Sequence, residues 1–85
     1  MTTIAQLVDD AAAALETCTE WSVIEGPTPE SRAWIGTVQG WRFLAVVADG
    51  VVYGTATNVL LGQILRMPPV LCRRATALAR MALGD

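Results

Sequence analysis

The sequence contains no histidine, no lysine and only two cysteines, Cys18 and Cys72, which lie far apart in the chain. These absences exclude zinc centres of the usual cysteine and histidine kind, histidine-based triads, lysine Schiff bases and P-loop lysines. Both cysteines are expected to be small buried hydrophobic residues rather than a disulfide. The arginines beside Cys72, near a helix N-terminus, would lower the pKa of its thiol, but we predict no catalytic role for it. We therefore expect no enzyme, no cofactor and no metal site.

Charge is also scarce, since charged residues make up 16% of the 85 residues and hydrophobic residues 53%. This composition excludes a disordered tail, and a net charge of −2 argues against an electrostatic nucleic-acid binder. The longest uncharged run, residues 50–65, contains polar residues and glycines and cannot form a membrane-spanning helix. With no secretory leader in view, we expect a cytoplasmic protein with a single compact domain over residues 1–85.

Helical signals stand at both ends of the chain. Thr3 and Gln6 have the spacing of a capping box, and an apolar face of period 3.6 follows as far as Cys18. A last helix is predicted from Pro69 to Leu83, with Gly84 as its C-terminal stop. Before it, residues 59–66 are apolar all round, which predicts a short buried or interfacial helix capped by Asn58 or Thr57.

Between the helices the sequence predicts an antiparallel meander. The strands are expected at residues 21–25, 33–38, 41–48 and 51–57, with turns at Gln39-Gly40 and Asp49-Gly50. Residues 26–31 form a loop, because two prolines and a glycine prevent ladder pairing. The predicted fold is α+β in the order α-β-β-β-β-α-α, with three to four strands and two C-terminal helices.

Two-residue turns set the register of the meander and therefore its two faces. The core face carries large side chains, with small residues at positions 36, 45, 54 and 56 leaving room for a helix: Trp34, Val38, Trp41, Phe43, Val47 and Val52. The opposite face is also largely apolar, so either the last helix or another chain covers it. We expect a homodimer, in which self-association involves Ile35, Leu44, Tyr53, Leu61 and Leu65.

The charges are divided along the chain. Residues 1–31 contain six acidic and no basic residues, whereas residues 32–85 contain all six arginines and two aspartates. One interpretation is that the first and last helices pair their charges within one chain. Another is that an acidic row binds a protein target with a basic surface, through Asp9, Asp10, Glu16 and Glu20. The alternative is a nucleic-acid-binding regulator that uses Arg66, Arg73, Arg74 and Arg80.

The helix–meander–helix order resembles that of double-stranded-RNA-binding domains at Gly26-Pro27, at Asp49–Gly54 and in the terminal helix. The lysines and the loop histidine of that family are missing, so the resemblance concerns topology alone. Small acidic proteins without catalytic groups look like phage-encoded inhibitors, immunity proteins or antitoxins. We therefore predict a macromolecular inhibitor, of the anti-CRISPR or immunity type, with a structural subunit of a larger assembly as a further alternative.

Overall fold

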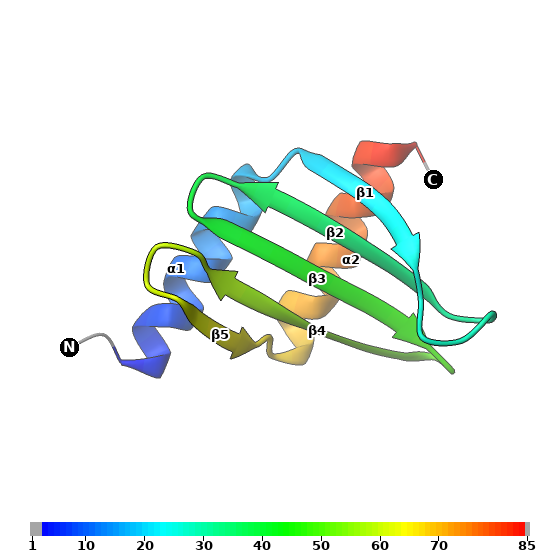
Figure 1. Ribbon diagram of the computed structural model, residues 1–85, viewed down its shortest axis with the longest axis horizontal. Coiled ribbons are helices and arrows are strands. Elements are labelled where there is room, and N and C mark those ends of the chain that lie inside the picture. The colour runs from blue at the N-terminus through cyan, green and yellow to red at the C-terminus, as the bar shows by residue number, and fades with distance from the viewer. Residues whose placement is uncertain (1–2, 85) are drawn as a thin grey trace.

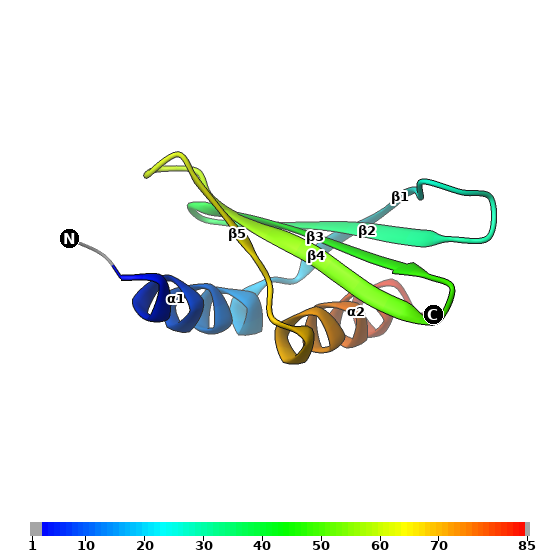
Figure 2. The same cartoon turned by 90° about the horizontal axis from the view of Figure 1, so that it is seen from below.

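A computed structural model describes residues 3–84 of the chain. One antiparallel sheet has the strand order β1-β2-β3-β4-β5, so each strand pairs with the next one in sequence (Figure 1). Both helices pack on the same face of this sheet, which gives two layers (Figure 2). The α+β class is thus confirmed, with elements α1 (Ile4–Thr17), β1 (Glu20–Glu25), β2 (Arg32–Val38), β3 (Trp41–Ala48), β4 (Val51–Asn58), β5 (Gln63–Arg66) and α2 (Pro69–Leu83).

Local signals define both helices as predicted. The backbone N–H of Gln6 donates to Thr3 Oγ1 at 3.1 Å, and the N–H of Thr3 donates to Gln6 Oε1 at 3.0 Å, which completes the capping box of α1. Helix α2 ends at Gly84, whose φ of 71° is left-handed, so that its N–H reaches the last carbonyls of the helix. The structural description contains no helix that is both long and apolar enough to cross a membrane.

The predicted register is also correct. Val38 pairs with Trp41, Trp34 with Ala45, and Val47 with Val52. Asp49 and Gly50 both have positive φ, 51° and 75°, as a tight two-residue hairpin turn requires. All six large residues predicted for the core face are buried or packed against the core under the two helices.

The prediction of a short helix over residues 59–66 is wrong. Asn58 Oδ1 does accept the N–H of Leu61 at 3.0 Å, but it caps a turn that Gly62 completes with a φ of 65°. The chain then returns as β5, in which Leu65 faces the core and Ile64 faces outward. Pairing with β4 supplies backbone hydrogen bonds to this segment and places the half-buried Leu65 against the core. The fold therefore has two helices and five strands.

The small residues of the core face have two different functions. Ala45 and Ala56 are fully buried in the cluster that α2 joins through Leu71, Ala75 and Ala79. At Gly36, by contrast, a Cβ would meet the ring of Trp21, and at Gly54 it would meet the carbonyl oxygen of Leu44. For the two glycines, the prediction of room for a helix is wrong, since a side chain and a neighbouring strand approach them.

The face of the sheet opposite the helices, here called the open face, is covered by no element within residues 3–84 (Figure 2). Sequence left open whether the last helix covers it, and the structure shows that α2 lies on the other side. The apolar residues of the open face are Ile24, Ala33, Ile35, Leu44, Val46, Ala48, Val51, Tyr53 and Ile64. Tyr53 is 45% exposed and Ile24 37%, whereas Val46 and Ala33 lie buried between their neighbours.

Candidate functional site

Helix α1 presents three of the four predicted acidic residues on its solvent side. Asp9 and Glu16 are seven residues apart and lie two turns from each other, with Asp10 next to Asp9, and all three are exposed. We call Asp9, Asp10 and Glu16 the acidic surface of α1. Glu20 is separate, because it begins β1 and its side chain projects on the open face, opposite to that of the buried Trp21.

One ion pair joins the acidic helix to the arginine-bearing helix. Arg74 donates two hydrogen bonds to the carboxylate of Glu16, from Nε and from Nη2, each at 2.7 Å. About half of each side chain remains exposed. The hydrogen bond from Arg74 lowers the pKa of Glu16 from its ordinary value, and the same contact raises the pKa of Arg74. The intramolecular interpretation of the charge asymmetry is therefore correct for this pair.

The Glu16–Arg74 pair predicts a pH-dependent contribution to stability. Because the pKa of Glu16 is lowered by folding, its contribution is present above the unfolded-state pKa and is lost as the pH falls through the folded-state value. We expect Glu16→Gln to lower the Tm slightly at pH 7, and the difference from wild type to shrink as the pH falls below the ordinary glutamate pKa of about 4.3. Thermal unfolding followed by circular dichroism across this range, with Glu30→Gln as control, measures it. A difference that stays constant with pH would contradict the assignment.

The four predicted nucleic-acid contacts do not share one surface. Arg73 and Arg74 are exposed near the start of α2, whereas Arg66 projects from β5 on the open face, across the sheet from them. Arg74 is engaged by Glu16, and the guanidinium carbon of Arg80 lies 5.2 Å from the centre of the Trp34 ring. The structure thus separates these arginines and uses two of them in contacts within the chain.

Sequence reasoning missed the position of Arg32. Its guanidinium carbon lies 5.7 Å from the centre of the Trp34 ring, so Arg32 and Arg80 both contact this one indole. The sequence indicates only the contact of Arg32 with Trp34, because residues two apart on a strand lie on the same face. It contains no signal for the contact of Arg80. The buried indole N–H of Trp34 has no hydrogen-bond partner among residues 3–84.

The residues predicted for self-association fall into three places. Ile35, Leu44 and Tyr53 lie together on the open face, the first two half-buried. Leu61 is exposed in the turn between β4 and β5. Leu65 packs against the core on the helix side of β5, so the structure does not bring it together with the others.

The two cysteines are free and buried. Cys72 donates to the carbonyl oxygen of Met67 at 3.4 Å, and Cys18 donates to that of Thr37 at 3.5 Å. Burial raises the pKa of both thiols. The prediction of a lowered pKa for Cys72 is wrong, because desolvation outweighs the charge of Arg73. Both cysteines are therefore buried thiols in the core, and the prediction of small buried residues without a disulfide is confirmed.

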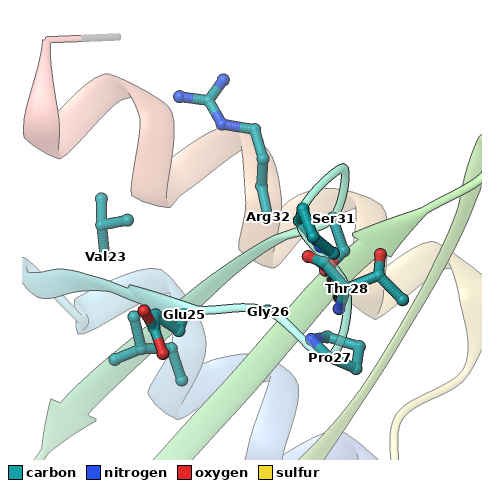
Figure 3. Close-up of a pocket in the computed structure, with 9 residues that line it drawn as sticks. Val23, Glu25, Gly26, Pro27, Thr28, Ser31 and Arg32 are labelled. Atoms are coloured by element: carbon teal, nitrogen blue, oxygen red, sulfur yellow. Dashed lines mark hydrogen bonds between the residues drawn. The ribbon is translucent and has the colours of Figure 1, made fainter.

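A surface pocket of about 610 Å³ lies beside the loop between β1 and β2 (Figure 3). Ser31 Oγ donates to the carbonyl oxygen of Thr28 at 2.7 Å and accepts the N–H of Thr28 at 3.0 Å, so the loop is closed on itself. Figure 3 shows Ser31 and Thr28 next to each other and Arg32 directed away from the loop. The pocket is open to solvent, and the hydroxyl side chains that line it, those of Thr28 and Ser31, belong to this closed loop.

Comparison of the chain with models of protein families, with curated proteins and with solved structures gives no match. Within the described residues, no three carboxylate or thiol groups converge as a metal ion requires. Two surface features carry the predicted binding residues, the acidic surface of α1 and the open face. They lie on opposite sides of a two-layer α+β protein.

Proposed function

We propose that this protein is a cytoplasmic, non-enzymatic binding protein whose target is a protein with a basic surface. The observation that supports this proposal is the exposure of Asp9 and Asp10 on α1, where no ion pair engages them among residues 3–84. No arginine precedes position 32, so the carboxylates of α1 have no basic residue on their own helix.

The helix that carries these carboxylates is well anchored. The capping box holds its first turn, and Ala11 and Leu15 are fully buried against the sheet. A row of charges on a rigid helix loses little conformational freedom on binding, and it steers an oppositely charged partner from a distance. This arrangement suits an inhibitor that occupies a basic, nucleic-acid-binding channel of its target, as expected for the anti-CRISPR or immunity type.

The acidic surface is tested directly with a deca-arginine peptide as the probe of a basic target. We expect Asp9→Asn/Asp10→Asn to weaken peptide binding about fivefold or more at low salt, because each exposed charge pair contributes up to about 1 kcal/mol. Glu30→Gln, an exposed carboxylate in the loop after β1, is the matched control. Fluorescence anisotropy measures the affinities, and equal affinities for all three proteins would reject the acidic surface as the binding site.

The inhibitor type has its own test in cells. Expression in a bacterium with an active CRISPR–Cas system should restore plating of a targeted phage, and the Asp9→Asn/Asp10→Asn protein should fail to do so. If the protein binds the peptide but has no effect on phage plating, the proposal of a protein that binds basic surfaces stands, and the anti-CRISPR type of inhibitor is rejected.

The nucleic-acid alternative is weakened by the separation of the four arginines and by the Glu16–Arg74 pair. Light-scattering mass on a size-exclusion column, with short duplex DNA or RNA at low salt, distinguishes the two. A mass shift that is abolished by Arg73→Gln and by added salt would favour the regulator. A protein that is insoluble without a partner would instead favour the structural subunit.

A further inference from the structure

The open face has two edges of opposite charge. Glu20 projects from β1 at one edge, and Arg66 projects from β5 at the other. Both side chains are exposed. The row of Glu20 continues through Thr37, Arg42 and Thr57, and the next row, which ends at Arg66, carries the apolar Ile35 and Leu44. A surface with this arrangement is complementary to itself when it is turned over, because its acidic edge then faces its own basic edge.

We propose that the open face binds a second copy of this chain, sheet against sheet, about a twofold axis that runs along β3. This rotation places β1 over β5 of the second copy and β2 over β4. Because this rotation keeps each position along the strands, Glu20 lies over Ile64 of the other chain, two residues along β5 from Arg66, whose long side chain can reach the carboxylate, and by symmetry the contact occurs twice. The interface lies on the opposite side of the sheet from the acidic surface of α1. The proposal of a dimer therefore does not depend on the proposed function.

The sizes of the side chains fit the same rotation. Ala33, Val46 and Tyr53 form one row across β2, β3 and β4. Turning this row over places the large, 45% exposed Tyr53 above the small Ala33 of the second copy. Val46 and Leu44 both lie on β3, near the axis, so each would face the same residue of the second chain. The two copies of Arg42 lie at the end of the interface, where their long side chains can reach water.

The area available matches a weak but specific dimer. Five strands about 4.8 Å apart and about 20–25 Å long give a face of about 500 Å² per chain. Two such faces bury about 1,000 Å², the lower limit of specific protein interfaces. We therefore expect a concentration-dependent dimer with a Kd on the order of micromolar.

Charge reversal tests the interface without touching the core. Glu20→Arg alone and Arg66→Glu alone should each weaken the dimer about tenfold or more, because both symmetric contacts become repulsive. The double variant Glu20→Arg/Arg66→Glu should restore the wild-type affinity. Glu30→Arg, which changes the net charge equally but lies outside the open face, is the matched control and should dimerise like wild type. Sedimentation equilibrium measures all five proteins.

A second pair of variants tests the apolar centre. Leu44→Asp should give a monomer of 9.1 kDa, while Ile4→Asp, exposed on α1 across the sheet, should leave the dimer intact. A wild-type protein that stays monomeric up to about 1 mM would overturn the proposal. So would a dimer that survives all changes on the open face but is lost in Leu61→Asp, because the interface would then be the turn between β4 and β5.

Discussion

Replacing Trp34 with alanine is expected to lower the free energy of unfolding by about 3–5 kcal/mol. Trp34 is fully buried on β2 beneath the helices and is among the largest side chains of the core. The change removes buried apolar area, leaves a cavity and abolishes the contacts with Arg32 and Arg80. Because small domains are stable by only about 5–15 kcal/mol, this loss would bring the protein close to unfolding. Urea unfolding followed by circular dichroism measures the change.

Trp34→Phe is the matched control for this prediction. It keeps an aromatic ring, and the indole N–H that it removes has no hydrogen-bond partner among residues 3–84, so no hydrogen bond within that range is lost. We expect it to cost less than half as much as the alanine substitution. A Trp34→Ala protein destabilised by less than about 1 kcal/mol would contradict the central place of this side chain in the core.

Gly54→Ala is expected to destabilise the protein by about 3 kcal/mol, the upper end of the cost of overpacking. Gly54 pairs with Ala45, and an added Cβ would meet the carbonyl oxygen of Leu44 on the neighbouring strand. It would also lie 3.0 Å from the methyl carbon of Met67. The methionine can move, but the carbonyl belongs to the backbone of β3, so the alanine separates two central strands or bends β4.

The control for Gly54→Ala is Gly50→Ala in the hairpin turn. Gly50 has a φ of 75° and no atom within 4 Å of an added Cβ, so only backbone strain opposes the change. That strain costs about 1–2 kcal/mol for an alanine. Equal stability of the two variants in urea unfolding would contradict the prediction, because it would show that the close approach of β3 does not exclude a side chain at position 54.

Much of the fold follows from short-range signals in the sequence. The capping box at Thr3 and Gln6, the left-handed stop at Gly84 and the Asp49-Gly50 turn act over a few residues, and each is observed as predicted. Because a two-residue turn sets the register of its strands, the face that carries Trp34 and Phe43 was also predictable. Local geometry alone was sufficient for these features.

Residues 59–66 show where local signals are insufficient. Their composition suits a buried helix, and Asn58 makes the expected capping contact. The choice between helix and strand was decided by the free edge of β4, which offers hydrogen bonds to a segment that Gly62 can turn back. Such ladder pairing depends on a strand that the segment itself does not contain.

The candidate sites divide in the same way. The exposure of Asp9 and Asp10 could be predicted, since both lie off the apolar stripe of α1. The pairing of Glu16 with Arg74, 58 residues away, and the raised pKa of Cys72 depend on how the helices pack and on desolvation in the core. The register set by the two hairpin turns predicted that the second face of the sheet is apolar, but only the tertiary structure decided that both helices lie on the first. The reason is that helix placement depends on the summed burial of the whole chain, which no local pattern contains.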